Sequence, residues 1–113
     1  MNATVQLLKD VNRLIFKRRS PHWQKVRNDF LAKHKACAAC GTTKHLQAHH
    51  CVPFHVDPSR ELDPTNLIVL CEPIGPRGCH CRRGHLGNYR KWNPNVVADA
   101  AKALADKFNR KKI

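Results

Sequence analysis

The chain has 113 residues, of which 21 are Lys or Arg and only 8 are Asp or Glu, so its formal net charge is +13. A single domain of this size buries a modest core, for which a structural metal is a natural supplement. No apolar run reaches membrane-spanning length and no signal peptide opens the chain, so we expect a cytoplasmic, intracellular protein with no membrane partner. The positive charge indicates an anionic partner, and nucleic acid is the leading class.

Two amphipathic helices are predicted in residues 1–35, which form a helical preamble. Apolar residues recur at helical spacing over residues 3–18. Ser20 followed by Pro21 is typical of an N-cap and a first-turn proline, so a second helix is expected to begin there. The predicted buried stripe of that helix is Trp23, Val26, Phe30 and Leu31.

The cysteines predict a structural zinc site. Cys37 and Cys40 enclose two residues, a spacing that lets both thiolates point at one metal. Cys71 and Cys79 form a looser second pair, because the seven residues between them contain prolines and glycines that can loop out. Cys81 is an alternative fourth ligand. In a reducing compartment such cysteines are metal ligands rather than disulfides.

Two short strands are predicted, over residues 46–51 and 67–70, with a proline-containing loop between them. Successive strand residues point to opposite sides, so His49 and His50 are expected to take different roles, one on a metal and one towards water. A neutral imidazole can activate water at physiological pH. Cys51 alternates away from His50 and is interpreted as a small buried apolar residue.

Two helices are predicted in the last third of the chain. A short helix begins near Cys79 and carries His80 and His85, and a longer helix follows Asn93-Pro94. The predicted apolar face of the longer helix is Val97, Ala101, Leu104 and Phe108. Four other histidines are assigned to the surface or to packing, namely His22, His34, His45 and His55.

Taken together, these residues resemble the HNH nuclease family, whose core is the ββα-metal or His-Me finger motif. The sequence is most similar to small stand-alone HNH proteins of bacteriophages and bacteria. The match runs through Cys37-x-x-Cys40, residues 46–53, residues 63–71 and residues 79–85, about half of the chain.

The resemblance implies an α+β fold in one domain, residues 1–113. Its small zinc-stapled ββα-metal core would span residues 37–92, flanked by the helical preamble and by a C-terminal helix over residues 93–113.

The resemblance also implies a role for each matched residue. His50 matches the general base, and Asn66 matches the asparagine that orients this base and fixes its loop. His49 matches a ligand of the catalytic metal. His80 matches the third signature residue, on the helix that completes the metal site, and His85 is a further candidate ligand.

The two helix histidines depart from the commonest pattern. Helix geometry favours ligands four residues apart, whereas His80 and His85 are five apart, so His85 is slightly preferred. Cys81 and His85 are four apart and form an alternative pair, whose mixed donors would suit zinc rather than magnesium.

The function implied is that of a metal-dependent DNA endonuclease, which nicks or cuts both strands by a one-metal mechanism with Mg²⁺, Mn²⁺, Ni²⁺ or Zn²⁺. The residues expected to hold the phosphate backbone are Arg82, Arg83, Arg90 and Lys91. The alternative is a non-catalytic zinc module that binds nucleic acid. The resemblance alone implies contact with a phage terminase or packaging machinery in an infected host. We expect a monomer or a weak dimer.

Overall fold

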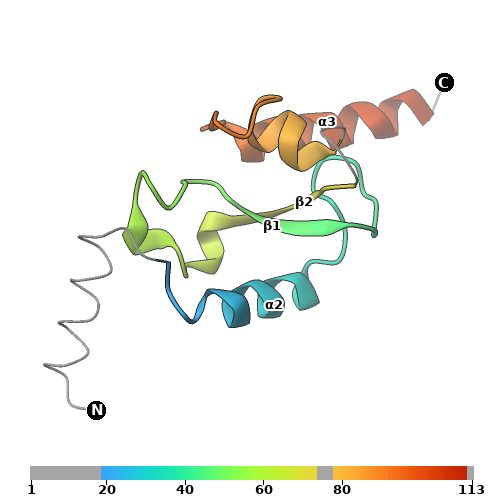
Figure 1. The fold of residues 1–113 in the computed structure, drawn as a ribbon. Helices are drawn as coiled ribbons and strands as arrows, with labels where there is room; N and C mark the ends of the chain where they lie inside the picture. The colour runs from blue at the N-terminus through green and yellow to red at the C-terminus, as the bar shows by residue number, and fades with distance from the viewer. Residues whose placement is uncertain (1–18, 74–77, 112–113) are drawn as a thin grey trace, which may run out of the picture.

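A computed structural model describes residues 19–73 and 78–111, and the helix predicted over residues 3–18 lies outside this part of the chain. The fold is α+β, as predicted (Figure 1). In chain order its elements are α2 (Trp23–Lys33), β1 (Leu46–His50), η1 (Pro58–Arg60), η2 (Pro64–Asn66), β2 (Leu67–Cys71), η3 (His80–Gly84) and α3 (Val96–Lys111).

The two strands form an antiparallel hairpin-like sheet in which Leu46 pairs with Cys71 and His50 pairs with Leu67. Every residue of β2 is buried, as its continuous apolar run predicts. The sheet of the described chain has two strands, so the outer edge of β1 is not paired with a further strand there.

Helix α2 covers one face of the sheet (Figure 1). Phe30 packs with Leu67 and Val69 of β2, and the other three residues of the predicted stripe are partly buried around them, so the predicted stripe is confirmed. The helix begins at Trp23 rather than at Pro21, because Ser20 closes a turn before it: the Ser20 hydroxyl accepts a hydrogen bond from the His22 N–H at 3.1 Å.

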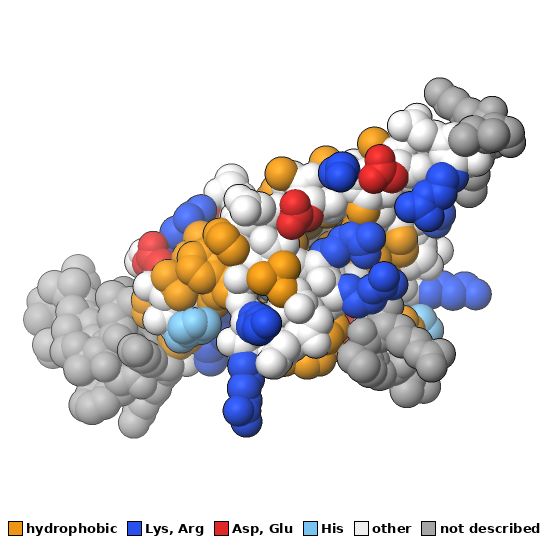
Figure 2. Space-filling view, turned by 90° about the horizontal axis from the view of Figure 1, so that it is seen from above, with side chains coloured by type: hydrophobic (Ala, Val, Ile, Leu, Met, Phe, Trp, Pro, Cys, Tyr) orange, Lys and Arg blue, Asp and Glu red, His pale blue; other side chains and the backbone are white. Residues whose placement is uncertain are grey.

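The opposite face of the sheet is covered by η3 and α3 (Figure 1). The predicted apolar face of α3 is wrong. Val96 and Ala100, each 1% exposed, pack against the cysteines and β2, whereas Val97 and Phe108 are each 59% exposed. The helix carries two apolar stripes that are offset by one residue and have the same spacing. Tertiary packing buries the stripe that begins at Val96 and not the predicted one, which begins at Val97. Seen from above α3, the surface carries many Lys and Arg side chains with few carboxylates among them (Figure 2).

Within residues 19–73 and 78–111, no helix has the length and hydropathy needed to cross a membrane.

Candidate metal centres

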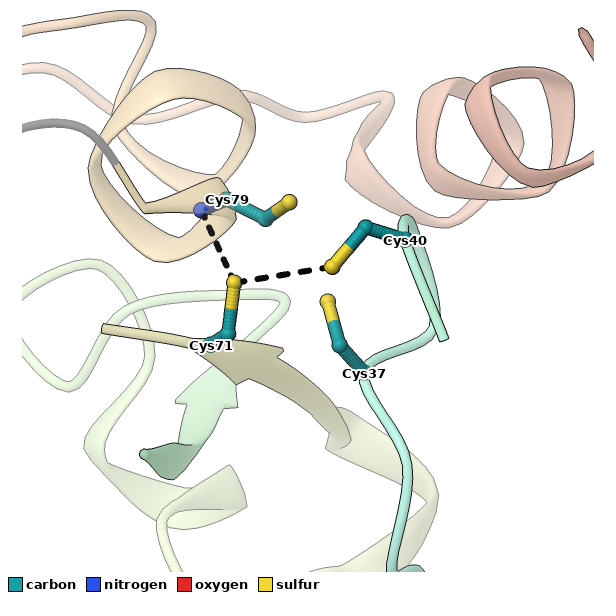
Figure 3. A group of neighbouring side chains, drawn as sticks. All are labelled: Cys37, Cys40, Cys71 and Cys79. Atoms are coloured by element: carbon teal, nitrogen blue, oxygen red, sulfur yellow. Dashed lines mark hydrogen bonds between the residues drawn. The ribbon is translucent and has the colours of Figure 1, made fainter. Parts of the chain in front are cut away.

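Four cysteine side chains point at one another between β2, η3 and the loop that precedes β1 (Figure 3). They are Cys37, Cys40, Cys71 and Cys79, and their Sγ atoms all lie within 4.8 Å of one another. The Sγ atoms of Cys40 and Cys71 are 3.7 Å apart. Tetrahedral zinc with Zn–S bonds of about 2.3 Å separates its sulfurs by about 3.8 Å, so this group fits a tetrahedral ion.

Cys81, the alternative ligand, does not belong to the four-cysteine group, although it is only 1% exposed. The Cys51 side chain is partly buried against the same core, in keeping with its interpretation as an apolar residue, and burial raises the pKa of its thiol. The chain therefore brings together the two predicted pairs and leaves two other cysteines outside them.

The electrostatics of the cysteine group favour a bound cation. Burial opposes ionisation of Cys37, but backbone N–H groups, including that of Cys40, more than offset it and lower the pKa of this thiol. Burial, together with the negative charge of neighbouring sulfurs such as Cys37, raises the pKa of Cys79. Four thiolates in a buried site repel one another, and a divalent cation removes that cost. The group could therefore hold a metal ion.

Three histidines form a second group between β1 and the η3 segment. One ring nitrogen each from His49, His80 and His85 lies within 4.8 Å of the others. The Nε2 atoms of His80 and His85 are 3.2 Å apart. Two imidazoles bound to one ion at about 2.0–2.1 Å in tetrahedral geometry would place their nitrogens about 3.3 Å apart, so this group also fits a metal.

The spacing of His80 and His85 is explained by the turn that carries them. Residues His80–Gly84 form a π-helical turn, in which hydrogen bonds join residues five apart instead of four. Both predicted helix histidines belong to the group, so the structure gives no reason to prefer His85 to His80. Cys81 belongs to neither group of three or more possible ligands in the described chain.

The outer ring nitrogens of these two histidines are held by fixed acceptors. His80 Nδ1 lies 3.0 Å from Oε1 of Glu72, and His85 Nδ1 lies 2.9 Å from the carbonyl oxygen of Lys91. The Tyr89 hydroxyl also donates to Glu72. Because a carbonyl and a carboxylate only accept, both Nδ1 atoms donate, and the two Nε2 atoms face each other with lone pairs free for a metal.

His49 provides the strongest indication of a missing ligand. Its ring is 4% exposed, and its Nε2 atom has no hydrogen-bond partner among the described residues. Burial, with the neighbouring histidines, lowers the pKa of His49 to about 3, so the ring is neutral. A buried polar atom without a partner is costly, and a metal ion would satisfy it. Gly84 permits this arrangement, because a Cβ there would lie 2.9 Å from the His49 ring.

His50 faces the other side of β1, as strand alternation predicts. Its ring contacts Trp23 of α2, with centroids 4.4 Å apart, and its Nε2 lies 2.9 Å from the carbonyl oxygen of Glu61. That nitrogen therefore donates, which leaves Nδ1 as the basic atom. Burial lowers the pKa of His50, with a further contribution from Arg19, so the ring is neutral at physiological pH.

The loop behind His50 is fixed by two buried polar side chains. Asn66, fully buried, accepts from the Val52 N–H and donates to the carbonyl oxygens of Val52 and Arg60. The Glu61 carboxylate accepts from Arg19 Nε at 2.5 Å and from the Ser20 N–H at 2.8 Å. Asn66 thus holds the loop whose Glu61 carbonyl binds His50, and its hydrogen bonds go to this loop rather than to the His50 ring.

The four predicted phosphate-binding residues separate into two pairs. Arg90 and Lys91 line a cleft of about 450 Å³ together with all four site histidines. Arg82 and Arg83 line a different hollow beside α3, and Arg83 lies 3.9 Å from the sulfur of Cys79.

Sequence reasoning missed two glutamates that support the histidines, Glu72 through its carboxylate and Glu61 through its backbone carbonyl oxygen. Glu72 lies between Cys71 and a proline, a context typical of a turn residue. Only its contact with His80 shows that it supports the histidine group. It also missed Arg19 and His55 as residues that line the cleft. His22, His34 and His45, assigned to the surface, are exposed.

Comparisons with protein families, curated proteins and solved structures found no match, so the interpretation depends on the residues of this chain.

Proposed function

We propose that this protein is a metal-dependent endonuclease of the HNH type that hydrolyses phosphodiester bonds in DNA. The observation that carries the proposal is the meeting of four histidines at one cleft: three whose ring nitrogens converge, and a fourth, His50, fixed beside them. A non-catalytic zinc module would account for the cysteines and the charge, but it gives the histidines no purpose.

A divalent ion on His49, His80 and His85 would stabilise negative charge on the bound phosphate and on the leaving oxygen. Imidazole donors favour zinc, nickel or another transition metal over magnesium. The four-cysteine group would hold a structural zinc, because a site of four thiolates has no open coordination position.

His50 acts as the general base. Its Nε2–H stays bonded to the Glu61 carbonyl, which fixes the tautomer, and Nδ1 takes the proton from the attacking water. Since the pKa of His50 lies below its ordinary value, the basic form is populated at neutral pH. Asn66 and Glu61 serve as positioning residues, because they hold the loop that aligns this ring.

Strand scission tests this proposal. Supercoiled plasmid and single-stranded circular DNA would be incubated with purified protein and Mg²⁺, Mn²⁺, Ni²⁺ or Zn²⁺ in turn. We expect cleavage by the wild type, and at least a hundredfold slower cleavage by His50→Ala at unchanged metal content. His34→Ala is the matched control, since His34 is exposed and stacks on Phe30 outside the cleft. The proposal fails if the wild type is inactive with every metal, or if His50→Ala cuts as fast.

A further inference from the structure

The cleft beside the histidines follows the unpaired edge of β1. Four consecutive strand residues, Gln47 to His50, line it, although alternate residues point to opposite faces of the sheet. Both sets can reach one cleft only along the strand edge. Helix α2 forms one wall, and the segment from His85 to Trp92 forms the other.

The α2 wall presents a cation, Arg27, that no acidic side chain of the described residues neutralises. Arg27 donates to the amide oxygens of Gln47 at 3.0 Å and Asn28 at 3.2 Å, and no described carboxylate lies within ion-pair distance of it. Two neutral acceptors orient the guanidinium without removing its charge. Arg19, on the same wall, differs because its Nε binds the buried Glu61 carboxylate.

The opposite wall supplies two further cations and an aromatic ring. Arg90 and Lys91 are exposed, and the Tyr89 side chain is 50% exposed at the edge of the cleft. Trp23 is less available, because its ring contacts His50 and lies 5.7 Å from the Arg19 guanidinium. Phe54 is buried, and Trp92 is partly buried with its Nε1–H bonded to the Cys51 carbonyl oxygen, so Tyr89 is the aromatic residue best placed to stack on a base.

The size of the cleft limits what can enter it. A volume of about 450 Å³ is that of a site for one small ligand, so the cleft fits a short stretch of one strand. Cations that follow a backbone, with an aromatic ring beside them, are the usual means of holding a single strand.

We infer that the substrate enters as one DNA strand whose backbone lies between Arg27 and the Arg90–Lys91 pair, with a base stacked on Tyr89. The strand then passes the three histidines and His50. This inference rests on the proposed nuclease function and specifies its substrate as single-stranded DNA, or a single-stranded part of a longer molecule.

Binding of labelled oligonucleotides tests the inference. His50→Ala protein keeps the DNA intact, and fluorescence anisotropy would compare a 12-nucleotide strand with the same strand annealed to its complement. We expect the single strand to bind at least tenfold more tightly. Arg27→Ala, added to this background, should weaken single-strand binding about tenfold and reduce the slope of log Kobs against log salt by about 0.7.

Lys25→Ala is the matched control, because Lys25 lies on the same helix and is paired with Asp29 at 2.8 Å. It should change single-strand affinity less than twofold. Equal or tighter duplex binding overturns the inference, and so does an Arg27→Ala effect no larger than that of Lys25→Ala. DNA cleavage distinguishes the two proposals. A protein that is inactive with every metal contradicts the nuclease function. A protein that cleaves DNA but gives either of these binding results contradicts only the inferred single-strand path.

Discussion

Replacing Gly84 with alanine tests whether the His49 ring is held in place for a metal. A Cβ on Gly84 would lie 2.9 Å from Cε1 of His49 and 3.1 Å from each of its ring nitrogens. His49 is only 4% exposed, so its ring cannot move into solvent to make room. The methyl group and the ring therefore compete for the same space.

The magnitude follows from the cost of overpacking. An added methyl group in a well-packed site costs about 1–3 kcal/mol. The His49 ring can relieve this strain by turning away from His80 and His85. The free energy of metal binding at the histidine group then becomes less favourable by the same amount, which lowers the metal affinity about 5- to 150-fold. The four-cysteine group, the proposed zinc site, is formed by other side chains and should keep its ion.

Calorimetric titration with Ni²⁺ would measure the affinity of the histidine group, and native mass spectrometry would count zinc. Gly87→Ala is the matched control. Gly87 has φ +85° with no atom within 4 Å of its would-be Cβ, so alanine there costs about 1–2 kcal/mol of backbone strain without touching His49. Equal Ni²⁺ affinity in the two variants would refute the reasoning.

Three further outcomes are expected. Glu72→Gln should weaken metal binding at the histidine group about 10- to 100-fold in a calorimetric titration, because the amide is a poorer acceptor for His80 Nδ1. The control variant Asp106→Asn should bind the metal as the wild type does. Asn66→Ala removes three buried hydrogen bonds, so chemical denaturation should show a loss of about 3 kcal/mol; a loss below 1 kcal/mol contradicts this. Cys81→Ser should retain zinc and Cys79→Ser should lose it, as counted by native mass spectrometry.

Local patterns were sufficient to predict the parts of the site that depend on backbone periodicity. Alternation along β1 separates His49 from His50 whatever surrounds the strand, and the structure has them on opposite sides. The spacing of Cys37 and Cys40 likewise predicts, within a single turn of the chain, that both thiolates can bind one metal. These inferences need no knowledge of distant contacts.

The parts that could not be predicted are those where the local sequence is compatible with more than one backbone register or packing arrangement. The π-helical turn at η3 differs from an α-helix by one step in hydrogen-bond register, and no residue type marks that step. Helix α3 has two apolar stripes one residue apart, and its packing against the cysteines selects the one with Val96. Arg82 and Arg90 share a segment of chain, yet the turn between them directs them to different hollows.

The two candidate metal groups are joined through sequence neighbours, which couples the binding of their ions. Cys71 is followed directly by Glu72, and Cys79 is followed directly by His80, so an ion bound by the two cysteines also fixes the Glu72 and His80 side chains, which meet at 3.0 Å. The coupling free energy is the same in both directions, so an ion that four thiolates bind far more tightly than this coupling survives the loss of the histidine ion.

We therefore expect Cys40→Ala to lose zinc and, with it, most Ni²⁺ binding at the histidines, although Cys40 is not part of that group. His85→Ala should lose Ni²⁺ binding and keep one zinc per chain. Native mass spectrometry of both variants gives the two counts directly. If Cys40→Ala bound Ni²⁺ as the wild type does, the cysteine group would be a separate staple, and the geometry of the histidines would depend on the β1–β2 pairing alone.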